Sequence, residues 1–458
     1  MPSSEQHPSF PPSTTATILP LAPLQPDLHE RAWVSVPHPT LPLLATAHSK
    51  GATVFSLATL SAHSALTGGH TRSVRSVAWQ PGLPPHKLCL ATASFDSTAG
   101  LWRWDGDATG GDALEREVTA ASATRRDGGD GDDDGDGAGD RDWEFTLVLE
   151  GHESEIKSCA FSPSGAYLAT SSRDKSVWIW DEYGATTGGA GGGNEDDDEW
   201  ETLAILNEHE GDVKAVAWCP DVPGRNARRR FSRDVLASAS YDNTVRVWRE
   251  DADGEWVCVA VLEGHAGTVW GVQWEPRPDN ERFPRLLTFS ADSTVRVWTL
   301  KDDDDGDGDG AARSSALGGI PNTMRRSLRE EWTCTAVLPK AHDRDIYAAA
   351  WSGASGLVAS TGSDGIIALY RELQPPQPSS SSASTDGDGP ATNGHAASPA
   401  AQWELLTTVP NAHGPYEVNH ITWCRRYDAG SARRGEEEMM ISTGDDGVVR
   451  PWEVKLDS

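Results

Sequence analysis

The stretch "SRDKSVWIWD" (residues 172–181) places an aspartate, Asp174, six residues before a tryptophan, Trp180, at the start of a β-strand pattern. The same arrangement returns along the chain. The aspartates are Asp96, Asp174, Asp242, Asp292, Asp364 and Asp446, and the aromatic residues six positions later are Trp102, Trp180, Trp248, Trp298, Tyr370 and Trp452. Self-similarity of this kind indicates that the chain is an array of repeats.

Two further polar positions recur in register with each aspartate. A Ser or Thr lies four residues before it, and a His ends a short turn upstream. The histidines are His70, His152, His209, His265, His342 and His413. A buried imidazole, hydroxyl, carboxylate and indole can satisfy one another's hydrogen bonds. A catalytic Ser-His-Asp set has no reason to recur six times, so we expect a structural network and no enzyme activity.

These registered positions resemble the WD40 repeat, whose unit is a four-stranded propeller blade. One further blade is expected first in the sequence, where Thr46 keeps the hydroxyl but Lys50 and Ser56 replace the aspartate and the tryptophan. We therefore predict an all-β, seven-bladed WD40 β-propeller over residues 17–458, after a disordered extension at 1–16. Residues 17–24 are apolar and should supply the missing outer strand of the last blade, which closes the ring.

The formal net charge of −30 lies largely in insertions. Acidic or Ser/Pro-rich segments at about 105–142, 184–199, 301–331 and 373–402 are typical of disordered loops. They lack the residue spacing of a calcium loop, so we expect no metal site. Net acidity argues against direct binding of nucleic acid. The basic segment at 225–233 is interpreted as a solvated loop, with a nuclear-import or nucleic-acid patch as the weaker alternative.

The cysteines and the N-terminus bear on cellular location. The six cysteines have no Cys-x-x-Cys spacing, which favours reduced thiols in the cytosol or nucleus and argues against a metal, a cluster or another cofactor held by this chain alone. No apolar run reaches 18 residues and the N-terminus is unlike a signal peptide. We expect a soluble, monomeric, cytoplasmic protein without membrane contact, and leave the nucleus open.

The insertions indicate which face of the disc carries function. Assigned to the expected strands, they all open on one face, so the other face keeps short turns on a rigid frame. On that face, the positions just before the turn aspartates include Phe95, Arg173 and Tyr241, and the residues that open the inner strands are Trp33, Arg75, Lys157, Lys214, Trp270, Tyr347 and Asn419. Aromatic residues interleaved with Arg and Lys favour protein binding. We predict that this face binds a peptide or protein that carries carboxylates and an aromatic side chain. The alternative for each Trp is that it fills a gap between blades.

Several segments, among them "EGHESEIKSCAFS", "SRDKSVWIWD", "GSDGIIALYRE" and "HGPYEVNHITW", resemble the family of WD40 scaffold proteins of cytosolic iron-sulfur protein assembly. The resemblance implies a non-catalytic subunit of the targeting complex. It also implies binding to the other subunits, a small adaptor and a large helical-repeat protein, and to apo iron-sulfur client proteins. The exposed arginine of the family maps to Arg173. Pro451, within the last strand, departs from the family pattern and removes a backbone donor there.

A different class of function stays open from the residues alone. A WD40 substrate receptor or a chromatin-associated peptide reader would use Trp33, Trp270 and Tyr347 as an aromatic cage for methyl-lysine. The neighbouring Arg and Lys side chains would repel such a cation, which makes this the weaker alternative. An enzyme is weaker still, because no cluster of His, Cys or carboxylates remains once the repeated network is explained.

Overall fold

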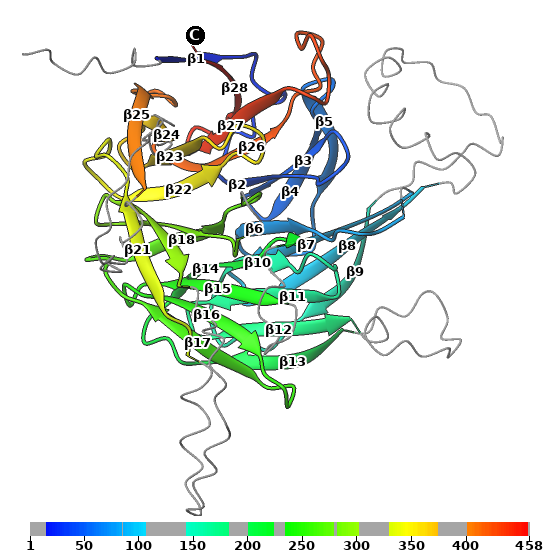
Figure 1. Cartoon of the computed structure of the whole chain (residues 1–458). Coiled ribbons are helices and arrows are strands. Elements are labelled where there is room, and N and C mark those ends of the chain that lie inside the picture. The colour runs from blue at the N-terminus through cyan, green and yellow to red at the C-terminus, as the bar shows by residue number, and fades with distance from the viewer. Residues whose placement is uncertain are drawn as a thin grey trace, which may run out of the picture.

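The computed structural model describes residues 15–84, 86–106, 143–182, 200–223, 234–278, 282–301, 329–373 and 401–456. Over these residues the chain forms seven antiparallel sheets of four strands each, arranged around a central axis (Figure 1). The predicted seven-bladed propeller is therefore confirmed. The predicted insertions and the N-terminal extension lie almost wholly outside the described residues.

Each blade is a meander whose first strand lies nearest the axis. Blade 1 consists of β2 (Ala32–Pro37), β3 (Leu43–His48), β4 (Gly51–Ser56) and β5 (Ser61–Leu66), and blade 2 of β6 (Val74–Trp79), β7 (Lys87–Ser94), β8 (Ala99–Asp105) and β9 (Glu144–Leu149). Blade 3 consists of β10 (Ile156–Phe161), β11 (Tyr167–Ser172), β12 (Val177–Glu182) and β13 (Trp200–Leu206), and blade 4 of β14 (Val213–Trp218), β15 (Val235–Ser240), β16 (Val245–Glu250) and β17 (Trp256–Leu262).

The second half of the ring repeats this pattern. Blade 5 consists of β18 (Val269–Trp274), β19 (Leu286–Ser290), β20 (Val295–Leu300) and β21 (Trp332–Val337), and blade 6 of β22 (Ile346–Trp351), β23 (Val358–Gly362), β24 (Ile367–Leu373) and β25 (Gln402–Val409). Blade 7 consists of β26 (Val418–Arg425), β27 (Glu438–Gly444), β28 (Val449–Leu456) and, as its outer strand, β1 (Ala16–Pro20).

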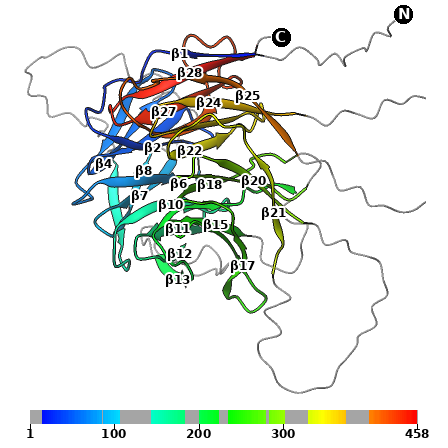
Figure 2. The same cartoon turned by 90° about the vertical axis from the view of Figure 1, so that its left-hand side faces the viewer.

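The N-terminal strand closes the ring as predicted. β1 pairs antiparallel with β28, from Ala16 opposite Leu456 to Pro20 opposite Trp452, and the two strands lie side by side in both views (Figures 1 and 2). Pro451 is buried within β28, and its carbonyl accepts a hydrogen bond of 2.9 Å from the backbone N–H of Leu21. The missing donor of the proline therefore does not break the seam, because the carbonyl still binds the closing segment.

The core lies between the blades, so the middle strands are buried on both faces. β15 shows this, since all of its residues are buried, and it reads as a continuous run of small and apolar residues. Tryptophans at the ends of inner strands tie neighbouring blades together. The Trp79 indole N–H donates to the Val36 carbonyl at 3.0 Å, and Trp218 donates to Ala160 at 2.9 Å. Trp274 and Trp423 repeat this bond to the preceding blade.

The long connections join the strands that the sequence predicted. The gaps in the described chain at 107–142, 183–199, 302–328 and 374–400 fall between the third and fourth strands of blades 2, 3, 5 and 6, and those at 224–233 and 279–281 fall between the first and second strands of blades 4 and 5. In an antiparallel meander, both kinds of connection open at the same end of the strands. The opposite face carries the short turns between second and third strands.

Candidate functional site

A hydrogen-bonded chain of four side chains recurs inside blades 2 to 7. In blade 3, the Trp180 indole N–H donates to the Thr170 hydroxyl at 3.0 Å, which lies 2.8 Å from His152 Nε2. His152 Nδ1 lies 2.8 Å from Asp174 Oδ2. The imidazole thus accepts from the threonine at Nε2 and donates to the carboxylate at Nδ1. Every polar atom of the chain has a partner of the correct kind.

The turn aspartate also fixes the backbone of the turn. Asp174 accepts hydrogen bonds from the backbone N–H groups of Glu153, at 3.0 Å, and Ser176, at 2.9 Å. Lys175, which lies between Asp174 and Ser176, adopts a positive φ of 74°. In the other five blades, the residue after the aspartate also has a positive φ; these residues are Ser97, Asn243, Ser293, Gly365 and Gly447. The carboxylate therefore stabilises a strained turn conformation for which non-glycine residues need support.

The charge state of the aspartates follows from these bonds. Burial acts to raise the pKa of Asp174, but the hydrogen bonds from His152 and Ser176 outweigh it and hold the pKa well below its usual range. The other five turn aspartates behave in the same way. Burial acts to raise the pKa of each, and hydrogen bonds to the carboxylate outweigh it and lower the pKa of Asp96, Asp242, Asp292, Asp364 and Asp446. The carboxylates are ionised acceptors committed to the blade interior, and none of the six lines a cavity described below.

Two blades depart from this pattern. In blade 6, Tyr370 takes the tryptophan position, and its hydroxyl lies 3.3 Å from the Ser360 hydroxyl. In blade 1, Thr46 hydrogen-bonds the Ser35 hydroxyl at 2.8 Å instead of a histidine. The first blade keeps a buried polar contact at the same place, although Lys50 and Ser56 leave it without an aspartate and an indole.

A β-bulge recurs at the start of each inner strand, on the face with the short turns. In β6 the pairing with β7 shifts between Val74 and Ser76, so Arg75 has no opposite residue. The residues skipped in this way are Trp33, Arg75, Lys157, Lys214, Trp270, Tyr347 and Asn419. A bulge re-aims a side chain out of the regular alternation. These are the same seven residues that the sequence placed at the opening of the inner strands.

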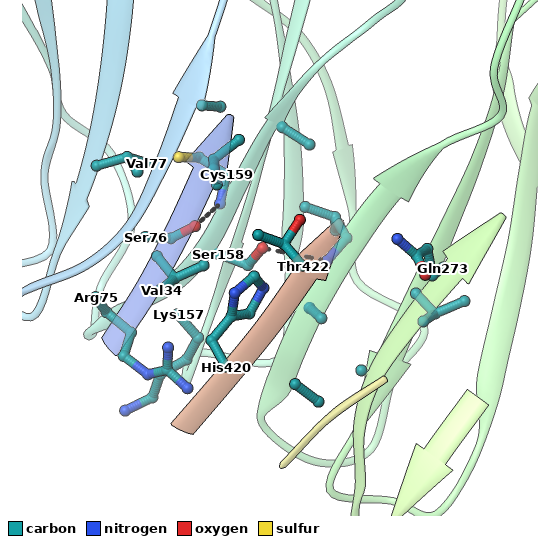
Figure 3. Close-up of a pocket in the computed structure, with 18 of the residues that line it drawn as sticks. Val34, Arg75, Ser76, Val77, Lys157, Ser158, Cys159, Gln273, His420 and Thr422 are labelled. Carbon is teal, nitrogen blue, oxygen red and sulfur yellow. Dashed lines mark hydrogen bonds between the residues drawn. The ribbon is translucent and has the colours of Figure 1, made fainter. Parts of the chain in front are cut away.

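The bulge residues surround the mouth of the central channel. They line one cavity of about 250 Å³, whose full lining is Arg31, Trp33, Arg75, Phe95, Lys157, Lys214, Trp270, Tyr347, Glu417 and Asn419. A second cavity of about 370 Å³ continues into the channel and shares Arg75, Lys157 and Lys214 with the mouth. Figure 3 shows Arg75 and Lys157 projecting toward the same end of this channel, with His420 beside them.

Cations and aromatic rings alternate around the mouth. The Arg75 guanidinium carbon lies 4.9 Å from the Trp33 ring centroid, and Lys157 Nζ lies 4.3 Å from that of Phe95. Lys214 Nζ lies 5.4 Å from the ring centroids of both Tyr241 and Trp270. Such contacts stabilise a cation at a partly desolvated site by about 0.5 to 2 kcal/mol. The rings therefore help to hold the cations in place.

Acidic residues neutralise only part of this positive charge. Lys157 forms an ion pair with Glu155, and Lys214 with Asp212 at 3.2 Å. Arg75 forms no ion pair with any carboxylate of the described chain. Burial lowers the pKa of Arg75 to about 10, with the charge of Arg31 as a second cause. The unneutralised guanidinium thus lies where a bound anion would stabilise it.

Arg173 and Tyr241 lie on the same face but outside the cavity lining. The Arg173 side chain is 59% exposed, with Nη1 3.9 Å from Glu155, and Tyr241 is 61% exposed. Both side chains are therefore exposed at the rim of the mouth. Trp270 also donates its indole N–H to Asp345 at 3.0 Å, so it both bonds to the next blade and borders the cavity.

The sequence reasoning missed three residues that shape the mouth: Arg31, Glu155 and Glu417. Glu155 contacts Arg72 at 2.8 Å as well as Lys157, and Glu417 accepts a hydrogen bond of 3.3 Å from the Tyr347 hydroxyl. A sequence signal exists for the two acids, Glu155 and Glu417. An acid lies two positions before the bulge residue in four blades, as Glu155, Asp212, Asp345 and Glu417.

Comparison with known proteins decides the family. A model of the WD domain, G-beta repeat (WD40), matches residues 55–103, 143–181, 200–249, 256–299 and 332–371. The chain is 59% identical over 468 residues to a Neurospora crassa protein named "Probable cytosolic iron-sulfur protein assembly protein 1", with 98% of each chain covered. Proteins of the same name are 58% identical in Chaetomium globosum, over 98% of each chain, and 61% identical in Pyricularia oryzae, over 95% of this chain and 96% of the relative.

The chain belongs to the cytosolic iron-sulfur protein assembly protein 1 family. The resemblance inferred from the sequence is thereby confirmed, and so is a role in cytosolic iron-sulfur protein assembly. Within the described part of this assembly protein, no three His, Cys, Asp or Glu side chains gather as a metal site requires. Its described residues also include no helix long and apolar enough to cross a membrane.

Proposed function

We propose that the protein is a non-catalytic scaffold of the cytosolic iron-sulfur targeting complex, and that it binds partner subunits and apo iron-sulfur client proteins for cluster delivery. The ring of bulge residues at the channel mouth carries this proposal. It presents Arg75, Lys157 and Lys214 among aromatic rings, on a chain whose net charge is −30. The family name supports the assembly role, and the local reversal of charge supports recognition of acidic segments.

The binding chemistry follows from the geometry of the mouth. A partner carboxylate would accept hydrogen bonds from Arg75 and the lysines, and an aromatic side chain would pack against Trp33, Trp270 or Tyr347. The bulges fix these side chains on paired strands, so little conformational entropy is lost on binding. Arg173 and Tyr241, at the rim, extend the contact surface. This arrangement suits a short segment of a protein better than a flat interface.

The absence of catalysis is part of the same proposal. The only repeated His, Asp and hydroxyl groups of the described chain are hydrogen-bonded to one another inside the blades. Groups that are satisfied in this way are poor candidates for a nucleophile or a general base. The family name supports the cytosol as the place of action.

Capture from cell extract tests the proposal. Wild-type protein should recover iron-sulfur assembly subunits and apo client proteins, identified by mass spectrometry, and the triple variant Arg75→Gln, Lys157→Gln, Arg173→Gln should lose them. Glutamine is preferable to glutamate, because a new carboxylate at 157 would repel Glu155 and disturb the fold. Arg433, exposed on the opposite face, provides the control variant Arg433→Gln.

Four results would contradict parts of the proposal. Wild-type protein that recovers no assembly subunit removes the scaffold role, and a triple variant that recovers all of them removes the channel mouth as the binding surface. Hydrolase or transferase activity of the pure protein would argue against a non-catalytic role. Selective binding of methyl-lysine peptides would instead favour a peptide reader.

A further inference from the structure

We propose that the channel mouth contains a subsite for a phosphate group, held by Arg75, Lys157 and Lys214 and carried by a phosphorylated side chain of a partner segment. The inference rests on the proposed partner-binding function and specifies the ligand chemistry of that site. Three observations support it: the charge of the channel lining, the missing acid beside Arg75, and the convergence of cations from three blades.

The channel lining has one sign of charge. Among the described residues that line the cavity of about 370 Å³, the charged ones are Arg75, Lys157 and Lys214, and none is an Asp or Glu. The other polar groups there are neutral, such as Ser76, Ser158 and Thr422. His420 is neutral as well, because burial lowers its pKa to about 3, with the charge of Arg75 as a second cause. The cavity is therefore an anion site without an internal counter-charge.

The missing acid has a local cause. The acid two positions before the bulge residue pairs with Lys157 in blade 3 and with Lys214 in blade 4. Blade 2 has Ser73 at that position, so Arg75 lacks the corresponding partner. Glu155 is further shared among Arg72, Lys157 and Arg173. The side of the mouth formed by blades 2 to 4 thus keeps a net positive charge.

The cations are close enough to repel one another. Burial is the largest cause that lowers the pKa of Lys157. The charges of Lys214 and Arg75 lower it further, and Glu155 acts in the opposite direction. A dianion relieves this repulsion more than a monoanion does. A phosphate monoester also offers three acceptor oxygens, so each of the three blades can donate to a separate oxygen, whereas a carboxylate has two. The arrangement favours phosphate.

The surroundings of the mouth favour a protein-borne phosphate over a free ion. Phe95, Trp33 and Trp270 line the cavity of about 250 Å³ at the mouth, which shares the three cations with the deeper cavity, and Tyr241 is exposed beside it. These rings offer little to an inorganic anion but can pack against residues that flank a phosphorylated side chain. The short turns of this face leave the mouth open to an extended segment.

Fluorescence anisotropy with labelled short peptides tests the inference. The probes share one sequence, with Trp residues flanking a central phosphoserine, serine or glutamate. The phosphoserine peptide should bind at least about tenfold more tightly than the other two. Binding should weaken as salt rises, because the contact is ionic. It should also weaken as pH falls from 7.5 to 5.5, because the second phosphate pKa is about 6 while a carboxylate stays ionised.

Two variants separate charge from folding. Arg75→Gln breaks no ion pair among the described residues and removes only the contact with the Trp33 ring, so it should change the thermal midpoint little and lose phosphopeptide binding. Ser73→Asp keeps Arg75 but places a carboxylate where blades 3 and 4 have one, so it should weaken binding about tenfold or more. Arg433→Gln, on the opposite face, should bind as wild type does.

Each contrary result is distinct. Equal binding of the glutamate and phosphoserine peptides overturns the phosphate assignment. Inorganic phosphate that displaces the peptide as effectively as unlabelled phosphopeptide does overturns the partner segment as its source. If no phosphopeptide binds while assembly subunits are still captured, this inference fails and the proposed function stands. If capture itself fails, the proposed function fails independently.

Discussion

Removal of the turn carboxylate in blade 3, by Asp174→Ala, tests whether the repeated network stabilises the propeller. Asp174 accepts hydrogen bonds from His152 Nδ1 at 2.8 Å and from the backbone N–H groups of Ser176 at 2.9 Å and Glu153 at 3.0 Å. The His152 side chain is 1% exposed, and that of Asp174 is 12% exposed. The Ser176 hydroxyl also donates to Asp174, at 2.5 Å, but it can rotate when that acceptor is lost. The variant therefore leaves the N–H donors of His152 Nδ1 and the Ser176 backbone without an acceptor inside the blade, while the exposed Glu153 N–H can turn to water.

The expected loss follows from the number of stranded donors. Each buried donor left without an acceptor costs about 1 to 3 kcal/mol, so two should lower the free energy of unfolding by about 2 to 4 kcal/mol, allowing for partial hydration of the turn. Urea unfolding measures the total loss in the free energy of unfolding. Hydrogen exchange localises it, because a large ring need not unfold in one step, and the amides of β11 and β12 should lose protection first.

The pH dependence of the free energy of unfolding tests the same role of Asp174 in a second way. The pKa of Asp174 is lowered in the folded state, so its contribution is present above the unfolded pKa of about 4 and is lost as pH falls below it. The difference between wild type and Asp174→Ala should shrink below pH 4. The control is Asp343→Ala, whose side chain is 86% exposed. If Asp174→Ala changes stability no more than this control does, the bracing role of the network is refuted.

Three further outcomes are expected. His420→Asn should flatten the pH dependence of the thermal midpoint between pH 7 and 4: with a folded pKa of about 3 against about 6.5 unfolded, the wild-type histidine takes up a proton on unfolding, so wild-type stability falls as pH falls. Glu330→Ala should lower the free energy of unfolding by about 3 to 5 kcal/mol in urea melts, because it breaks a buried ion pair with Arg249, 2.8 Å away, in which both side chains are 1% exposed; a loss below 1 kcal/mol would contradict this. Ile18→Asp, in the closing strand, should lower the thermal midpoint and cause aggregation visible by light scattering, since it frees the edge of β28.

Much of the candidate site was predictable from the sequence, because the repeats can be aligned with one another and equivalent positions then lie on the same face. Arg75, Lys157 and Lys214 occupy equivalent positions after each repeat's histidine turn, so aligning the copies placed them on one face without any knowledge of distances. Their convergence on one cavity was not predictable from one repeat, because the bulge that re-aims each side chain depends on pairing with the following strand. Arg31 was missed because its partner, Asp445, belongs to blade 7, which only ring closure brings beside blade 1.

The sequence by itself determined the number of blades, the turn aspartates and the closing strand, because these are local patterns repeated along the chain and each repeat must bury its faces against copies of itself. Only the tertiary structure decided which charges are neutralised. Arg72 and Glu155 are 83 residues apart in sequence and pair because blades 2 and 3 are neighbours, while Arg75, near the axis, forms no ion pair with a carboxylate of the described residues. Electrostatic energy depends on distance through space, and ring closure sets those distances.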